Sequence, residues 1–318
     1  MAPDLSLALD AASDAAPASP RRDPVAFIDL ARLGRTGWKS GGNAVLQLVG
    51  WQIVVALPVG VALYFKGTAL PEGFFEVVLL ATATLGWMLG LRGVARKAHR
   101  RPLLSLVSTD GRLDLGRIAL GAGLWLAAYL VVSMLGVAFY ALIQPAAASP
   151  AMDEPRALPS GMFLLAGLLS IALFPLQAGC EELVFRGWLT QTLGQALRRR
   201  WLLVLAVAVV FALAHAPFNG PFVFPTYVVM SLGLSALTLR DQRVELAIGA
   251  HAANNISVVL VGLFLSGSSS GVLSDPTPHP RTLFLHAGPL PWWTVPEAAL
   301  QFALIYAMAC WFLRRGER

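Results

Sequence analysis

Long apolar segments recur along the chain and alternate with short stretches that hold most of the charged residues. A helix needs about 20 apolar residues to cross the hydrocarbon core of a bilayer. The segments that approach this length are 44–65, 74–91, 118–143, 161–179, 201–215, 222–239, 246–265 and 294–313. The pattern therefore predicts an all-α, polytopic integral membrane protein of about eight transmembrane helices, which form one domain at 44–313.

Three regions outside these segments have compositions of their own. Residues 1–24 are rich in Ala, Asp, Ser and Pro, so we expect a disordered cytoplasmic tail. Residues 25–43 mix apolar and basic side chains, which favours an amphipathic segment at the membrane interface. Residues 266–292 are rich in Gly, Ser and Pro, which indicates a long loop on the non-cytoplasmic side.

Basic residues gather in alternate loops, and cytoplasmic loops of membrane proteins carry an excess of Lys and Arg. They follow the second, fourth, sixth and eighth segments, as Arg92, Arg96, Lys97, Arg100, Arg101, Arg112 and Arg117, then Arg198, Arg199 and Arg200, then Arg240 and Arg243, then Arg314, Arg315 and Arg318. The intervening loops are poor in positive charge. This alternation places both termini in the cytoplasm. The Ala- and Arg-rich composition indicates a bacterial inner (plasma) membrane.

The overall composition supports a membrane location and argues against nucleic-acid binding. Hydrophobic residues make up 56% of the chain and charged residues only 13%, whereas soluble domains carry about 25% charged residues. The net charge is +6, but no basic stripe carries interleaved aromatic residues, so the charge reflects topology. The two cysteines, Cys180 and Cys310, are far apart and indicate neither a disulfide framework nor a CxxC metal site.

The sequence GCEELVFRG at 179–187 places three charged side chains in an apolar region. Such a group at membrane depth costs at least about 2.5 kcal/mol, so it persists where it is paired or functional. Glu182 and Arg186 are four residues apart and share a helix face, whereas Glu181 is rotated by about 100°. We expect a structural Glu182–Arg186 pair and a free Glu181 facing a cavity. The alternative is a helix end whose charges are solvated at the interface.

Two further polar clusters follow along the chain. In FALAHAP, His215 lies one helical turn after Phe211, and Pro217 predicts that the helix ends just beyond the histidine. In HAANN, His251 and Asn255 share a helix face and Asn254 points elsewhere. Each cluster has an ordinary interpretation, an interfacial histidine for the first and interhelical hydrogen bonding for the second.

Taken together, the clusters supply the groups that peptide-bond hydrolysis needs. A carboxylate and a neutral imidazole can orient and deprotonate water, while an imidazole and an amide N–H can stabilise an oxyanion. Alternatively, Glu181, His215 and His251 are candidate ligands for a divalent metal such as zinc. The HExxH signature is absent, so the spacing does not require a metal. Cys180 beside two carboxylates is a poor nucleophile, because a thiolate there is costly.

The three clusters, in this order and on a polytopic chain, resemble the CPBP family, also called the Abi or type II CAAX-protease family. The resemblance covers about 160–265 and rests on Glu181-Glu182-x-x-x-Arg186, Phe211-x-x-x-His215 and His251-x-x-x-Asn255. It implies an intramembrane endopeptidase, often labelled a metalloprotease, in which Glu181 and His215 activate water. His251 and Asn255 would then stabilise the oxyanion, with Glu182, Arg186 and Phe211 in support.

The resemblance leaves the substrate open, because bacteria generally lack CAAX prenylation. The expected partners are a membrane protein or peptide substrate and the lipid bilayer, with no nucleic acid. Two alternatives use the same polar core: a catalytically silent immunity or partner-binding protein, and a transporter with a Glu/His proton relay. The transporter predicts an internal repeat, which the sequence lacks. One difficulty is depth, since His215 would lie toward the far end of its segment. We expect residues 188–200 to dip into the bilayer as an amphipathic helix, which would bring His215 level with Glu181.

Overall fold

The computed structural model describes residues 26–66, 70–71, 73–143, 160–197, 199–219, 224–265 and 294–316. Within them the chain is helical, with a single isolated β-bridge between Ser108 and Arg243. The principal helices are α2 (Trp38–Lys66), α3 (Phe74–Gly93), α4 (Leu115–Ile143), α5 (Gly161–Glu182), α6 (Thr190–Leu193), α7 (Arg200–Asn219), α8 (Phe224–Asp241), α9 (Glu245–Leu265) and α10 (Thr294–Gly316). Shorter elements are η1 (Phe27–Leu33), η3 (Val94–His99), η4 (Leu103–Leu106) and η5 (Leu183–Leu189).

Each of the eight predicted apolar segments is a helix, which confirms the all-α fold. Five helical segments of the described chain are long and apolar enough to cross a bilayer, namely Trp38–Phe65, Phe74–His99, Leu115–Phe139, Gly161–Leu193 and Thr294–Arg314. Arg200–His215 is apolar but shorter. The α8 and α9 helices fall outside this set and carry the buried polar residues Ser231, Ser235 and His251. The protein is therefore a polytopic integral membrane protein.

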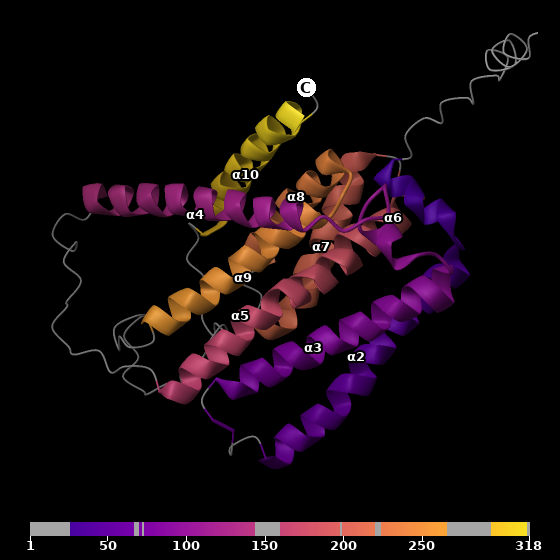
Figure 1. Ribbon diagram of the computed structural model, residues 1–318, viewed down its shortest axis with the longest axis horizontal. Helices are drawn as coiled ribbons and strands as arrows, with labels where there is room; N and C mark the ends of the chain where they lie inside the picture. Colours follow the sequence, from indigo (N-terminus) through magenta and orange to yellow (C-terminus); the bar gives the residue numbers. More distant parts are fainter. Residues whose placement is uncertain are drawn as a thin grey trace, which may run out of the picture.

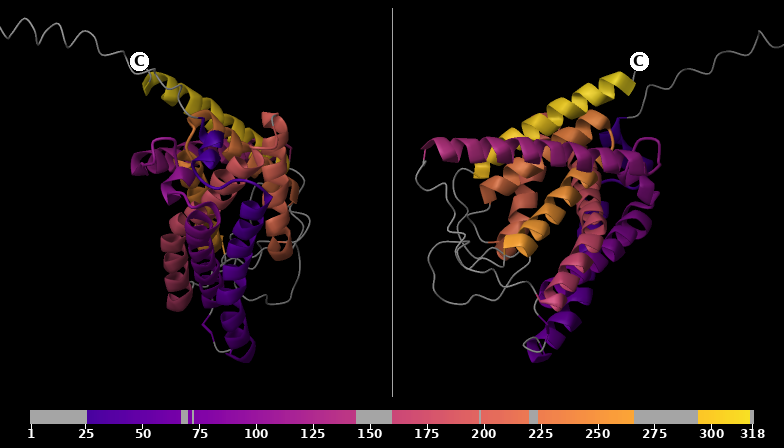
Figure 2. Two further views of the ribbon diagram at one scale, coloured as in Figure 1. Left: turned by 90° about the vertical axis from the view of Figure 1, so that its right-hand side faces the viewer. Right: turned by 60° about the vertical axis from the view of Figure 1, so that its left-hand side comes forward.

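Four helices lie side by side in the order α2, α3, α5 and α9 (Figure 1). The α4 helix packs across α9 at a steep angle, and α10 packs against both α4 and α8 (Figure 2). The α7 helix packs against α8, which in turn contacts α9. This arrangement brings α5, α7, α8 and α9 together in the middle of the molecule.

The large apolar side chains on the outer faces of these helices are exposed. Leu46 is 71% exposed and Leu130 is 61% exposed, and similar residues recur on α2, α4 and α5. A contiguous apolar surface of this extent is incompatible with water and fits contact with lipid. The polar groups are instead buried between the helices, so the fold places its chemistry inside the bundle.

The helix that carries Glu181 continues past the predicted segment end at 179. The π-helical turn η5 follows α5 directly, and α6 extends the helical run to Leu193. The chain then turns at 194–197 and returns through α7, which begins at Arg200. Glu181 therefore lies twelve residues before the end of one helix, and His215 lies fifteen residues after the start of the next. The predicted helix at 188–200 is not continuous, because α6 ends at Leu193 and α7 begins at Arg200. Two successive helices bring Glu181 and His215 together.

Two further sequence predictions bear on the ends of the helices. The α7 helix ends at Asn219, shortly beyond His215 as predicted, although it continues past Pro217. Within the predicted interfacial segment at 25–43, η1 packs against the protein with Phe27 and Leu30 buried, and α2 already begins at Trp38. The predicted tail at 1–24 and the predicted loop at 266–292 lie outside the described residues.

Candidate active site

Three helices bring one carboxylate and two imidazoles together. The Oε2 atom of Glu181, on α5, lies 3.7 Å from Nε2 of His215 on α7 and 3.6 Å from Nε2 of His251 on α9. These separations exceed a direct hydrogen bond but allow strong electrostatic interaction. Within the described part of the chain, Glu181 Oε2 has no hydrogen-bond partner although it is buried. The cluster therefore has an acceptor oxygen, flanked by two rings, that is free to bind a further molecule.

The neighbouring carboxylate, Glu182, is bound to the protein through one oxygen, Oε1, while its buried Oε2 also lacks a hydrogen-bond partner among the described residues. Its Oε1 atom accepts hydrogen bonds from Arg186 Nη1 and from His251 Nδ1, each at 2.8 Å. Arg186 also donates from Nη2 to Ser231 Oγ at 2.8 Å, and its guanidinium lies over the ring of Phe211. Glu182 and Arg186 have no solvent exposure. The two adjacent glutamates thus have separate surroundings, and the Glu182–Arg186 pair expected from the spacing is present.

The hydrogen bonds of both histidines direct Nε2 toward Glu181. His215 Nδ1 lies 2.8 Å from the carbonyl oxygen of Phe211, which can only accept, so Nδ1 carries a proton. His251 Nδ1 likewise donates to the carboxylate of Glu182. In the neutral form each ring therefore presents an unprotonated Nε2 to the shared space around Glu181 Oε2.

Aromatic rings hold the imidazole of His215 in place. Tyr227, on α8, stacks on His215 with ring centroids 4.7 Å apart and planes inclined by 25°. Phe211 lies one helical turn before His215, with centroids 4.3 Å apart, and its ring also meets His251 edge-on at 6.0 Å. The predicted supporting residue Phe211 thus contacts both histidines and Arg186. This packing limits the rotation of the His215 ring.

Asn255 lies one turn beyond His251 on α9, and its side chain is hydrogen-bonded to amide side chains next to the Glu181 cluster. Its Nδ2 donates to Gln177 Oε1 at 3.1 Å, and Asn254 Nδ2 donates to Asn255 Oδ1 at 3.1 Å. Gln177 lies one turn before Glu181 on α5. The two helices therefore face each other through two successive pairs, Glu181 with His251 and Gln177 with Asn255. One amide N–H of Asn255 remains for another partner.

Sequence analysis did not identify Gln177, Tyr227 and Ser231 as parts of this cluster. The sequence could have identified Gln177, because this residue precedes Glu181 by four positions and so shares its helix face. Tyr227 and Ser231 are also four apart, on the helix between the second and third polar clusters. Nothing in the sequence shows which of these polar residues face the glutamates, because that depends on how α8 packs.

The residues at the site are not arranged as a metal-binding group. Among the described residues, no set of three or more His, Cys, Asp or Glu side chains is placed to hold a metal ion. Glu181, His215 and His251, the candidate ligands, lie around one carboxylate oxygen, at separations of 3.7 and 3.6 Å. We therefore derive no catalytic step through a metal.

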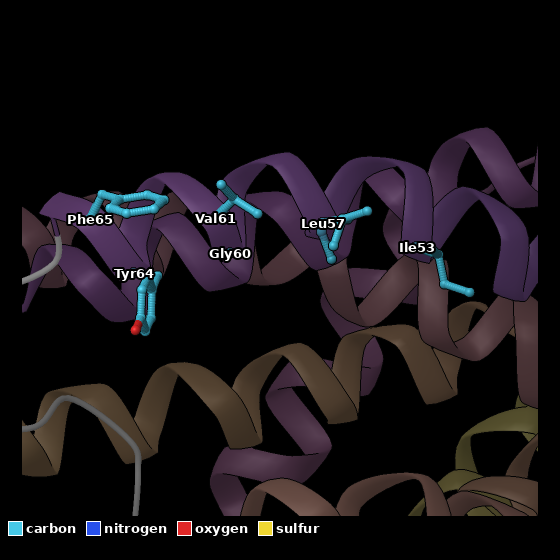
Figure 3. Close-up of a pocket in the computed structure, with 7 residues that line it drawn as sticks. Ile53, Leu57, Gly60, Val61, Tyr64 and Phe65 are labelled. Atoms are coloured by element: carbon cyan, nitrogen blue, oxygen red, sulfur yellow. The ribbon is translucent and has the colours of Figure 1, made fainter.

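Two surface hollows on the described residues lie away from this cluster, and we call them the larger and the smaller hollow. The first is the larger of the two. It has a volume of about 460 Å³ and is lined by one face of α2, from Ile53 to Phe65 (Figure 3). A smaller hollow of about 250 Å³ lies on the same helix, lined by Leu46, Gln47, Gly50, Trp51 and Val54. Neither includes a residue of α5, α7 or α9, so neither takes part in the chemistry at Glu181.

The fold and this cluster define a polytopic membrane protein with a carboxylate and two imidazoles buried between its helices. Comparison with known proteins gives a family likeness. Residues 161–257 match the sequence model of the type II CAAX prenyl endopeptidase Rce1-like family. This segment contains all three motifs and is similar to that family, as the motifs predicted. The match supports a CAAX-protease-like membrane endopeptidase at the level of the family.

One relative extends the similarity beyond this segment. The uncharacterized protein YyaK of Bacillus subtilis (strain 168) is 27% identical over 162 residues, which cover 49% of this chain and 51% of the relative. The chain thus matches about half the length of that protein. No solved structure gives a significant match to the chain.

Proposed function

We propose that this protein is an intramembrane endopeptidase that hydrolyses a peptide bond of a membrane-associated protein or peptide. The observation that carries the proposal is the arrangement around Glu181, whose buried Oε2 atom lies within 3.7 Å of two imidazole nitrogens and accepts no hydrogen bond from the described residues. A water molecule at this oxygen would be held by a carboxylate and by an imidazole of fixed tautomer. These are the groups that general-base catalysis requires.

In the proposed reaction, Glu181 and His215 Nε2 take a proton from the water as its oxygen attacks the carbonyl carbon of the scissile bond. The C–O bond forms and the carbonyl oxygen becomes an oxyanion. The tetrahedral intermediate then expels the amine, which receives the proton from the Glu181–His215 pair as the C–N bond breaks. Because the site is buried, these groups act in a low dielectric, where electrostatic stabilisation is strongest.

His251 and Asn255 are proposed to stabilise the oxyanion. Asn255 retains one amide N–H after its bond to Gln177. His251 donates from Nδ1 to Glu182, so a second donation from Nε2 requires the doubly protonated ring. The buried Glu182 carboxylate accepts this bond at 2.8 Å and so holds the ring of His251 in place from behind.

The test is cleavage of a membrane-tethered reporter peptide by the Glu181→Gln and His215→Ala variants at matched abundance. We expect cleavage to fall by about 10²- to 10⁴-fold in each, the range that a general acid or base contributes. Glu297→Gln, on the exposed face of α10, makes the same chemical change elsewhere and should retain full activity. Cleavage that survives both site substitutions would refute the endopeptidase and favour a silent immunity or partner-binding protein.

Metal analysis of the purified protein addresses the cofactor. The proposed mechanism predicts that cleavage persists after chelator treatment and dialysis, with less than one equivalent of bound zinc. Loss of cleavage on chelation, restored by stoichiometric zinc, would replace the water activation proposed above with a metal-dependent one.

We infer in addition that the protein resides in a bacterial inner membrane with both termini in the cytoplasm. The inference rests on the alternation of basic loops along the chain. Contacts also join two of the basic segments on one side of the molecule: after segment 92–101 the chain passes through η4 and a loop to α4, and this stretch binds segment 240–243 through the pairs Asp110–Arg243 and Arg117–Asp241. Labelling of single cysteines at positions 36 and 315 in intact cells, using a membrane-impermeant reagent, tests this orientation. Labelling without cell lysis would contradict it.

A further inference from the structure

A second polar feature lies at the N-terminal end of α2, distant in sequence from the three motifs. Five cations gather there, Arg35, Lys39, Arg96, Lys97 and Arg100, and all of them are exposed. Backbone contacts join the two segments that carry them. The N–H of Arg35 donates to the carbonyl of His99 at 2.7 Å, and the hydroxyl of Ser40 donates to the carbonyl of Ala98 at 2.9 Å. We call these five residues the cationic cluster.

The cationic cluster has no compensating negative charge in its vicinity along the chain. Asp and Glu are absent from 30–71 and from 77–109, the stretches that hold all five cations. None of the five takes part in the ion pairs found among the described residues. The basic residues at the start of α4 and between α8 and α9 differ, because Arg117 and Arg243 are each paired with acidic residues. The cationic cluster is thus a surface of unneutralised charge.

The neighbouring structure places the cationic cluster at the level of lipid headgroups. Trp38 is 82% exposed beside it, and the ammonium of Lys39 lies 5.6 Å from the centre of its ring. Tryptophan is enriched at the membrane–water interface. Below this level α2 is almost wholly exposed, with 6% of its most apolar window buried, and it contacts α3 on one side. The remaining surface of α2 faces the bilayer.

A shallow groove, lined by Leu46, Gln47, Gly50, Trp51 and Val54, begins on the same side of α2 as Lys39. The smaller hollow, between Leu46 and Val54, includes Gly50, where a side chain would meet nothing within 4 Å. Leu46 follows Lys39 by seven residues, which returns it to nearly the same helix face. Lys39 and Val54 are separated by roughly 22 Å along the helix axis, comparable to a headgroup layer plus half of a hydrocarbon core of about 30 Å. The larger hollow of Figure 3 continues along α2, from Ile53 to Phe65.

We propose that this side of α2 binds an anionic phospholipid, with the phosphate on the cationic cluster and an acyl chain in the groove between Leu46 and Val54. Positive charge explains the preference for an anion, and the adjoining groove explains the preference for a lipid over a soluble phosphate. Basic residues near a membrane surface attract anionic lipid headgroups. The site is independent of the proposed peptidase, because it shares no residue with it.

The experiment measures lipid binding to the purified full chain by native mass spectrometry, with phosphatidylglycerol and phosphatidylcholine of the same acyl chains. We expect the wild type to retain phosphatidylglycerol at least about tenfold more strongly. The Lys39→Gln/Arg96→Gln/Lys97→Gln variant should lose this preference. The control, Arg112→Gln/Arg199→Gln/Arg200→Gln, removes three exposed cations elsewhere and should keep it. Equal retention of both lipids by the wild type, or equal loss in both triple variants, would overturn the proposal.

Two further measurements test the groove and the phosphate-binding cations separately. Gly50→Leu fills the groove and should weaken retention of phosphatidylglycerol several-fold, whereas Gly123→Leu, at another position with open space around it, should not. Glycerol 3-phosphate at the same concentration should fail to displace the lipid. Displacement by glycerol 3-phosphate, or indifference to Gly50→Leu, would contradict the lipid assignment and leave a simple anion site. None of these measurements depends on peptide cleavage.

Discussion

Glu181 and Glu182 are adjacent in sequence yet stand in different environments, because each residue of a helix is rotated by about 100° from the last. The rotation turns Glu182 toward Arg186 and His251, which both donate to the same oxygen. It turns Glu181 toward the space between His215 and His251, where its Oε2 atom meets two imidazole nitrogens at distances too long for direct hydrogen bonds. Two glutamates that are adjacent in sequence therefore have different roles: Glu182 stabilises the structure and Glu181 is available for chemistry.

This contrast predicts opposite effects for the same substitution. Glu182→Gln leaves the Arg186 guanidinium buried without its carboxylate, and breaking a buried pair in this way costs about 3–5 kcal/mol. We expect a large fall in melting temperature and in the yield of folded protein in detergent. Glu181→Gln should leave both close to wild type while lowering cleavage by about 10²- to 10⁴-fold. Similar stability of the two variants would contradict the division of roles between the glutamates.

The stacking of Tyr227 on His215 makes a second prediction at this scale. Tyr227→Ala removes the ring that limits rotation of the imidazole, and a displacement of about 1 Å in a catalytic group can cost up to 10²-fold in rate. We expect kcat to fall by roughly 10- to 100-fold with little change in KM. Tyr227→Phe keeps the ring and should retain most of the activity. If Phe is as damaging as Ala, the hydroxyl matters and the stacking does not.

At the scale of the helices, the sequence predicted which segments are helical and which side chains share a face. It predicted the Glu182–Arg186 pair from a spacing of four, because that spacing is a property of one helix. It did not predict the π-helical turn at Leu183–Leu189, which carries no distinctive local pattern and lies directly after the two glutamates. The apolar segment ends at 179, but the helix runs on through Glu181 to Arg186, as the expected Glu182–Arg186 pair requires. Their partners on α8 and α9 are what allow them to remain buried.

The crossing of α4 and α9 depends on two glycines. A Cβ atom on Gly249 would lie 2.8 Å from the backbone nitrogen of Ala122 and closer still to the carbonyl oxygen of Ile118. Gly121 is similarly close to Leu246. Small residues let helices in membranes approach this closely. His251 follows Gly249 by two residues, so this contact sets the position of the histidine relative to the bundle.

We therefore expect Gly249→Ala to force α4 and α9 apart, with a loss of about 1–3 kcal/mol from overpacking and a fall in cleavage. Gly123→Ala is the control, because nothing lies within 4 Å of the added carbon and alanine is the better helix former by up to about 1 kcal/mol. Thermal unfolding in detergent and the reporter assay would measure both effects. A Gly249→Ala variant as stable and active as Gly123→Ala would show that the crossing tolerates the extra carbon.

At the scale of the molecule, the convergence of the site was inferred from a family resemblance and could not be derived from periodicity. Each helix face follows from spacing, but which faces meet depends on packing between segments far apart in sequence. Gln177 with Asn255 and Arg186 with Ser231 are contacts of this kind. The loops show the same dependence. The stretch at 107–112 joins the α8–α9 turn, where Val244 donates its N–H to the carbonyl of Val107 at 3.0 Å, and no local pattern predicts that contact.

This junction outside the membrane has a pH dependence that can be measured. Asp110 accepts hydrogen bonds from the Ser108 hydroxyl and from Arg243 Nη1, both at 2.7 Å. These bonds, with the Ser108 hydroxyl foremost, lower the pKa of Asp110 to about 2. The guanidinium of Arg243 also binds the buried Glu245, whose hydrogen bond is the main reason that the pKa of Arg243 is raised. A carboxyl whose pKa is depressed on folding stabilises the folded state above its unfolded pKa of about 3.9.

The contribution of Asp110 should therefore be complete at neutral pH and be lost as the pH falls from about 4 through 2. Asp110→Asn removes it, so the melting temperature of this variant should lie below that of the wild type at pH 7 by a small margin, since the pair is partly exposed. The difference should shrink steadily as the pH is lowered toward 2, because the wild-type carboxyl is then protonated as well. Asp29→Asn is the matched control at another partly exposed ion pair, and it lacks the link between the two loops. A difference between Asp110→Asn and wild type that grows with acidification would show that this junction is not held by the ionised carboxylate.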